Sequence, residues 1–141
     1  MKISSLIIFF LFLSACSVEP KKIEFGRDAC HFCKMTIVDT RHASEMVTKK
    51  GKVFKYDAIE CMINESRERD LSEIALWLVS DFDHPGEFLD APASWYLVSE
   101  AIPSPMGESL SAFGDSARAS DMASEHGGSY LSWTELRKKL E

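Results

Sequence analysis

The sequence predicts an α+β protein whose sheets are mainly antiparallel. A length of 141 residues allows one compact domain with its own core. Hydrophobic residues make up 45% of the chain, which is typical of a globular protein. Pairs of short β-branched or alternating runs are followed by segments with apolar residues at helical spacing. We therefore expect two similar strand-strand-helix units. Phe54 then Ala58 match Phe113 then Ala117 at an offset of 59, which indicates a weak internal repeat.

The first unit is expected to start directly after a cysteine-rich segment. Residues 35–39 are β-branched and partly alternating, and Lys50 with Gly51 suits a turn between two further alternating runs. Asp57 is a favourable residue to begin a helix, and Glu60 three positions later completes the pattern of a capping box. The predicted elements are strands at 35–39, 42–49 and 52–56 and a helix at 58–67.

The second unit is expected to have the same order. Its helix should begin at Asp115 or Ser116 and end before Gly127, because a polar cap and a glycine bound a segment of helical period. A proline-rich loop at 102–108 precedes its second strand. The predicted elements are strands at 74–82, 94–100, 109–113 and 129–132 and helices at 116–126 and 133–140.

The N-terminus predicts a lipoprotein signal. Lys2 follows the initiator, an unbroken apolar run occupies positions 6–13, and Leu-Ser-Ala-Cys ends at Cys16. The run is too short to span a bilayer, which takes about 20 apolar residues, but it suits a secretory signal. The tetrapeptide resembles the bacterial lipobox, in which cleavage precedes a cysteine that is then lipidated. We expect a signal peptide at 1–15, a lipid anchor and spacer at 16–24, and the folded domain at 25–141.

These features predict an extracytoplasmic lipoprotein on the periplasmic face of the outer or inner membrane, held by acyl chains on Cys16. The formal net charge of −6 gives no support to nucleic-acid binding, which needs a basic face. With Cys16 lipidated, Cys30, Cys33 and Cys61 remain, and an odd number does not suit a disulfide framework. A functional thiol site is the better interpretation.

Two thiols, an imidazole and a thioether fall within six residues, at Cys30, His31, Cys33 and Met35. A C-x-x-C pair can form a redox-active disulfide, hold half of a zinc site or bind a soft monovalent metal. Zinc is disfavoured because no second ligand pair follows; Cys61, flanked by apolar helix positions, is interpreted as a buried inert thiol. Thioether sulfur is a good ligand for Cu(I) and a poor one for zinc. The segment therefore favours Cu(I).

Cys33 and Met35 are the leading candidate ligands. In an extended segment their side chains would point the same way, because strand side chains alternate. Cys30 can join them across the turn, and Met106 in a Pro-Met-Gly loop is a candidate distant ligand. His31 is either a further ligand or a residue at the rim of the site.

Motifs along nearly all of the expected mature domain resemble the NosL family of membrane-anchored copper chaperones, associated with maturation of nitrous oxide reductase. These motifs are the lipobox, D-x-C-x-x-C-x-M-x-I at 28–37, F-x-x-D at 54–57, Cys-Met at 61–62, Ser-Pro-Met-Gly at 104–107 and Ala-Phe at 112–113. The resemblance implies that Cys33 and Met35 are primary Cu(I) ligands and that the Met106 loop is relevant. It also implies two similar small α+β units, related to the lyase that cleaves organomercurials.

The predicted function is a membrane-anchored, non-catalytic Cu(I) metallochaperone. It would deliver copper by ligand exchange to copper-enzyme assembly proteins or a transporter, with nitrous oxide reductase as the expected client. The alternative is an extracytoplasmic thiol–disulfide oxidoreductase that uses Cys30 and Cys33. A third possibility is a mercury-handling protein, although the sequence alone places no catalytic aspartate beside the thiols.

Overall fold

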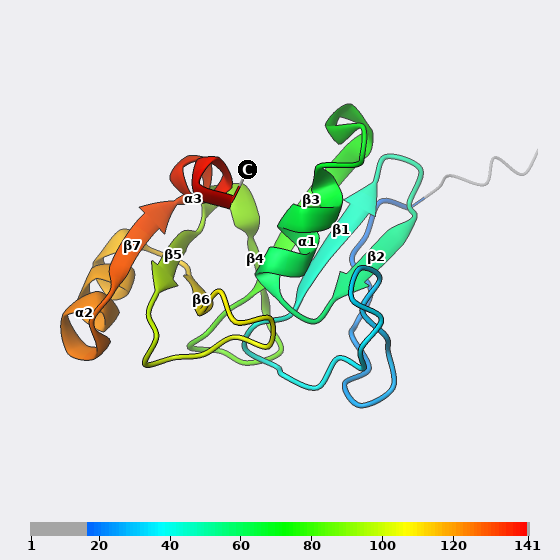
Figure 1. Cartoon of the computed structure of the whole chain (residues 1–141). Coiled ribbons are helices and arrows are strands. Elements are labelled where there is room, and N and C mark those ends of the chain that lie inside the picture. The colour runs from blue at the N-terminus through cyan, green and yellow to red at the C-terminus, as the bar shows by residue number, and fades with distance from the viewer. Residues whose placement is uncertain (1–16, 141) are drawn as a thin grey trace, which may run out of the picture.

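The computed structural model describes residues 17–140, so the predicted signal peptide and the anchoring Cys16 lie outside the described residues. Two antiparallel sheets and three α-helices make up the described part of the chain (Figure 1). No helix within residues 17–140 is long and apolar enough to cross a bilayer. The elements are β1 (Ser44–Thr48), β2 (Val53–Tyr56), α1 (Ile59–Ser66), β3 (Ile74–Ser80), β4 (Phe88–Asp90), β5 (Trp95–Val98), β6 (Leu110–Phe113), α2 (Ser116–His126), β7 (Ser129–Ser132) and α3 (Trp133–Leu140).

The two sheets repeat one connectivity. The first has the strand order β2-β1-β3-β4 and the second β6-β5-β7, so in each the first strand of the unit lies between the second strand and the strand after the helix. The backbone that starts the helices is also the same, with φ −145° and ψ 159° at Ala58 and φ −145° and ψ 160° at Asp115. The predicted α+β class is confirmed. Equivalent positions are 57 residues apart, as in this pair, so the predicted offset of 59 was wrong.

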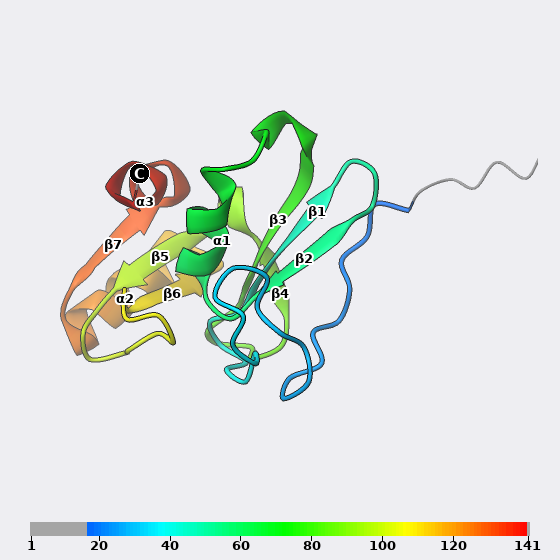
Figure 2. The ribbon, with the colours of Figure 1, turned by 45° about the vertical axis from the view of Figure 1, so that its right-hand side comes forward.

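Helix α1 packs between the two sheets. It contacts β1 and β2 on one side and β6 and α3 on the other, and Figure 2 shows it between the two layers. Nearly all of its residues are buried, and Ile59, Met62 and Ile63 join Tyr56 and Tyr96 in the main hydrophobic core. A helix enclosed in this way places polar and thiol side chains in the interior as well as apolar ones.

The predicted start of α1 was wrong. The cap residue is Ala58, and no side chain caps the helix. The carboxyl group of Asp57 instead accepts the N–H of Val38, and the carboxyl group of Glu60 accepts a hydrogen bond from Ser104. Because α1 is buried, its start is surrounded by hydrogen-bond donors from other segments. Val38 and Ser104 bind the two carboxyl groups, which therefore do not cap the helix. The solvent-exposed start of α2 follows the sequence rule, since the side chain of Asp115 caps it as predicted.

The strand predicted at 35–39 does not form. Only Thr36 pairs, in an isolated bridge with Ala29. Lys34 has a φ of 67°, and its N–H donates to the carbonyl of Cys30 at 3.0 Å. The chain therefore turns back at this point, and the side-chain alternation expected of a strand does not apply there.

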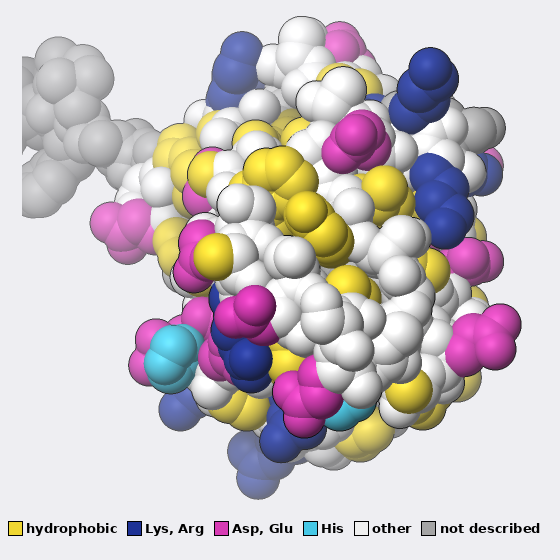
Figure 3. Space-filling view, turned by 90° about the vertical axis from the view of Figure 1, so that its left-hand side faces the viewer, with side chains coloured by type: hydrophobic (Ala, Val, Ile, Leu, Met, Phe, Trp, Pro, Cys, Tyr) yellow, Lys and Arg dark blue, Asp and Glu magenta, His cyan; other side chains and the backbone are white. Residues whose placement is uncertain are grey.

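The face formed by α2, β7 and α3 lies on the opposite side of the molecule from β2. Figure 3 shows hydrophobic side chains gathered in a band across this face, with charged side chains around it. Strand β7 is the edge of its sheet, and the half-exposed Tyr130 ring lies 6.0 Å from the ring of Trp95. The N-terminal segment that carries the cysteine pair runs along β2 instead (Figures 1 and 2).

Candidate metal centre

Cys30 and Cys33 lie on a tight turn fastened to the edge of β2. The N–H of His31 donates to the carbonyl of Lys55 at 2.8 Å, and the N–H of Cys30 donates to the carbonyl of Met35 at 2.8 Å. The N–H of Cys33 donates to the Cys30 sulfur at 3.4 Å. Cys30 is fully buried and Cys33 is half-buried. The turn therefore directs one thiol into the core and holds the other at its boundary with solvent.

Helix α1 supplies a third thiol. The Sγ atoms of Cys30, Cys33 and Cys61 all lie within 4.8 Å of one another, and all three cysteines are free thiols. The predicted burial of Cys61 is confirmed. The structure also places its sulfur beside the cysteine pair, a neighbourhood that its interpretation as an inert thiol did not include. Metal–thiolate bonds of about 2.3 Å place the ligands of a trigonal site about 4 Å apart. The three sulfurs therefore need only a small contraction to bind one ion.

The thiol cluster favours one negative charge, on Cys30. A hydrogen bond from the Cys61 thiol lowers the pKa of Cys30 to about 5, and the N–H groups of Asp57 and Cys33 add to the effect while burial opposes it. Burial raises the pKa of Cys33. The hydrogen bond that Cys61 donates to Cys30, followed by burial, raises the pKa of Cys61. A cation that binds all three sulfurs must therefore displace protons from Cys33 and Cys61.

Asp57 is a polar neighbour of the three thiols. The sequence alone predicted only that Asp57 begins a helix. Its N–H donates to the Cys30 sulfur, and its side chain is buried. Burial, and then the charge of Cys30, raise the pKa of this carboxyl group. Its Oδ1 atom has no hydrogen-bond partner among residues 17–140. The buried carboxyl oxygen next to a thiolate is a group whose charge a bound cation would compensate.

The predicted thioether ligands are on exposed loops. Met35 follows the cysteine turn and is 47% exposed, and Met106 is 38% exposed. The Met106 loop is fastened to α1, because the Ser104 hydroxyl donates to Glu60 and accepts the N–H of Ser109 at 2.9 Å. Glu60 precedes Cys61 in the chain. The loop is thus attached at the start of the helix that carries the third thiol, and the ligand roles of Met35 and Met106 stay predictions.

The sequence profile of the NosL family matches residues 21–140 of this chain. The chain belongs to the NosL family. The predicted family is therefore confirmed, and the match begins within the segment that we expected to be the spacer. In the structure Ile23 is already buried in the main core.

This NosL-family chain is similar to two proteins that are named NosL. The copper-binding lipoprotein NosL of Stutzerimonas stutzeri is 27% identical over 132 residues, which cover 88% of this chain and 69% of the relative. The crystal structure of the copper chaperone NosL from Shewanella denitrificans matches with a TM-score of 0.73 at 20% identity, over 84% of this chain and 96% of that one. The likeness to the crystal structure from Shewanella denitrificans shows the fold. Neither relative is named as an enzyme.

Proposed function

We propose that this NosL-family protein is a membrane-anchored Cu(I) metallochaperone. The observation that supports the proposal most directly is the group of three free thiols whose sulfurs lie within 4.8 Å of one another. Soft thiolate and thioether ligands select Cu(I), and a d¹⁰ ion accepts two or three of them without a demanding geometry. A structural zinc site would ask for a fourth protein ligand. Cys30, Cys33 and Cys61 form the inner ligand set of the proposed site, with Met35 and Met106 as thioether candidates.

The proposed site is suited to delivery because one of its three thiols lies at the boundary between the core and solvent. Cys30 and Cys61 are buried, whereas Cys33 is half-buried and Met35 is exposed. A ligand from a partner protein can therefore approach the metal past Cys33 and Met35. Exchange of one ligand at a time would transfer the ion without releasing it to water.

The anchor and the recipient complete the proposal. Cys16 would carry the lipid, on the periplasmic face of the inner or outer membrane, and the relative from Stutzerimonas stutzeri is also named a lipoprotein. The recipient would be a copper-enzyme assembly protein or transporter that serves an extracytoplasmic copper enzyme, with nitrous oxide reductase as the expected client. The kinship with organomercurial-cleaving lyases and a role in mercury handling stay predictions.

The thiol–disulfide oxidoreductase alternative is less well supported by the thiol environments. An attacking thiol must be both ionised and accessible. Cys30 has the lowered pKa of about 5 but is buried, whereas the more accessible Cys33 has a raised pKa. Neither cysteine of the pair combines the two properties that the reaction needs.

Replacing Met35 by leucine should weaken Cu(I) binding about 10-fold, because the variant loses the thioether but keeps a side chain of similar volume. Met106→Leu should have a similar effect if its loop supplies a ligand. The measurement is an anaerobic titration of Cu(I) between a competing chelator and the full chain in detergent micelles.

The matched control for both substitutions is Met122→Leu, because Met122 is buried in the separate small core cluster under α2. This variant should bind Cu(I) as tightly as the wild type. An unchanged affinity in Met35→Leu would remove Met35 from the ligand set. Absence of stoichiometric Cu(I) binding by the wild type would contradict the proposed function itself.

A further inference from the structure

The segment that leads from the expected lipid anchor is fastened to the folded domain. The N–H of Lys21 donates to the buried carboxyl group of Glu45 at 2.8 Å, and Ile23 is buried in the main core. Lys21 is five positions after Cys16, so even a fully extended chain spans at most about 17 Å between them. A lipid on Cys16 would therefore stay close to the part of the domain where this segment begins.

That part of the domain is the turn between β1 and β2. Ser17, the first described residue, lines a surface hollow together with Lys50 and Gly51. Figures 1 and 2 both show the start of the N-terminal segment at the end of the first sheet where this turn lies. The loop before β3 reaches the same end, because the N–H of Lys49 donates to the carbonyl of Glu73 at 2.8 Å. We call the surface formed by residues 17–21, 49–52 and 70–73 the anchor end.

Exposed lysines are concentrated at the anchor end. Three of the four residues in the β1–β2 turn are the exposed Lys49, Lys50 and Lys52, and the exposed Lys21 lies beside them. Among residues 17–140, only Lys50 of these three has a carboxylate partner, Glu73 at 3.8 Å. The chain as a whole carries a formal net charge of −6. A group of largely unpaired lysines in an acidic protein indicates a surface that meets an anionic partner.

The other side chains of the anchor end leave this lysine group exposed. Glu19, Asp70 and Glu73 are its acidic residues, and the Asp70 carboxyl group is engaged as the cap of a single helical turn. Val18 and Leu71 are two of the large hydrophobic side chains that stay exposed. Lysines beside exposed apolar side chains suit a membrane interface, where headgroups attract the charges and the apolar groups leave water.

The thiol cluster lies at the opposite end of β2. The strand runs away from the lysine turn, and the N–H of Asp57, the residue after the strand, donates to the Cys30 sulfur. The five positions from Lys52 to Asp57 span about 17 Å at about 3.4 Å per strand residue. The cysteine turn and the anchor end therefore lie at the two ends of one strand.

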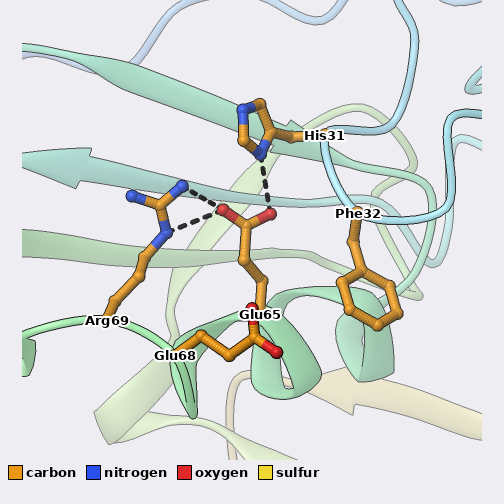
Figure 4. Close-up of a pocket in the computed structure, with 5 residues that line it drawn as sticks. All are labelled: His31, Phe32, Glu65, Glu68 and Arg69. Carbon is orange, nitrogen blue, oxygen red and sulfur yellow. Dashed lines mark hydrogen bonds and ion pairs between the residues drawn. The ribbon is translucent and has the colours of Figure 1, made fainter.

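The cysteine turn is fixed to β2 and α1, so it cannot swing toward the anchor end. The N–H of His31 donates to the carbonyl of Lys55 at 2.8 Å. His31 Nδ1 also lies 2.8 Å from one carboxyl oxygen of Glu65, while Arg69 donates to the other oxygen at 2.7 Å (Figure 4). The orientation of the anchor end consequently sets the direction in which the thiols face.

We propose that the anchor end is a docking surface for anionic phospholipid headgroups, on which the turn lysines hold the domain so that the three-thiol cluster faces away from the membrane. The inference rests on the lipid anchor of the proposed function. Each lysine at an anionic membrane surface favours the docked orientation about 5-fold, and a basic patch commonly reinforces an acyl anchor. The docked domain would present its thiols to protein partners in the aqueous phase.

The lipidated protein in nanodiscs tests this surface. The metal-free, ¹⁵N-labelled protein is reconstituted in phosphatidylcholine, with or without added phosphatidylglycerol, together with a lipid that carries a nitroxide on its headgroup. Paramagnetic broadening of the amide signals identifies the residues near the headgroups. With phosphatidylglycerol, signals of residues 49–52 and 70–73 should broaden strongly while those of residues 30–33 stay sharp. In phosphatidylcholine alone, the broadening at the anchor end should be several-fold weaker.

Reversing two turn charges isolates their contribution. Lys49→Glu combined with Lys50→Glu should reduce the broadening at residues 70–73 in phosphatidylglycerol nanodiscs to the level seen in phosphatidylcholine alone. The matched control is Lys138→Glu combined with Lys139→Glu, which changes the net charge equally on exposed residues of α3, away from the anchor end (Figure 1). The control variant should show the same broadening as the wild type.

The outcomes separate this inference from the proposed function. Broadening that is equal in the two lipid compositions, unchanged by the Lys49 and Lys50 reversals, or as strong at residues 30–33 would overturn the docking surface alone. A mass spectrum without a lipid on Cys16 would overturn the anchor of the proposed function and this inference together. Broadening at the anchor end that requires both phosphatidylglycerol and the turn lysines supports the inference.

Discussion

Replacing Cys61 by serine will lower the affinity for Cu(I) by about 100-fold or more. Loss of an outer partner of a metal ligand alone costs 10–100-fold, and the substitution removes one of three sulfurs that lie within 4.8 Å of one another. A hydroxyl oxygen is a hard donor and a poor ligand for Cu(I). The serine hydroxyl can still donate to the Cys30 sulfur, so the metal-free cluster keeps its hydrogen bond.

Because Cys61 is fully buried, the experiment needs a control for loss of stability. Ile63→Val removes one methylene from an equally buried position of α1 and should cost about 1 kcal/mol of unfolding free energy. Its Cu(I) affinity should equal that of the wild type in a competition titration. If Cys61→Ser also binds with wild-type affinity, Cys61 is not a ligand, and the site reduces to the residues of the turn.

Replacing Gly128 by alanine will destabilise the fold by about 3–5 kcal/mol, through strain and a direct clash. Gly128 has a φ of 99°, and a Cβ atom there would lie 2.1 Å from the carbonyl oxygen of Val98. Val98 pairs with Ser129 where β5 meets β7, so the clash falls on the start of a sheet pairing. Relief requires the two strands to separate. Urea unfolding of the metal-free protein, followed by far-UV circular dichroism, measures the loss.

Gly86→Ala separates the two causes of this loss. Gly86 has a φ of 89°, and no atom lies within 4 Å of the position that its Cβ would take. This variant carries the backbone strain alone and should cost about 1 kcal/mol. Equal costs for the two alanine variants would mean that the β5–β7 junction adjusts freely to a side chain at position 128.

The parts of the fold that local sequence determines were predicted well. The strands of the pairs β1–β2 and β5–β6 lie within the runs where strands were expected. Helix α2 has an aspartate cap and terminal glycines that are exposed to solvent, as the rules for helix ends assume. The short edge strand β4 was missed, because Phe88–Asp90 offers too few residues for a pattern. Errors at 35–39 and at Asp57 arose where tertiary hydrogen bonds overruled local preference.

The sequence predicted only the part of the candidate metal centre that lies on the cysteine turn. Cys30 and Cys33 are close in sequence, so their spacing was informative, whereas Cys61 enters through the packing of α1 against that turn. Apolar neighbours on a helix predict that a cysteine is buried, but they do not predict which other side chains its sulfur contacts. The odd number of cysteines was the available signal for a third thiol. The pairing of His31 with Glu65, 34 residues later, has no counterpart in local sequence.

The most direct test of the three-thiol site is the X-ray absorption spectrum of the full chain loaded anaerobically with one equivalent of Cu(I). The account predicts a first shell dominated by sulfur, at about 2.3 Å as in other metal–thiolate sites. The sulfur amplitude should fall in Cys33→Ala and in Cys61→Ser, since each removes one ligand. A first shell of nitrogen and oxygen alone, or a spectrum identical in all three proteins, would contradict the account.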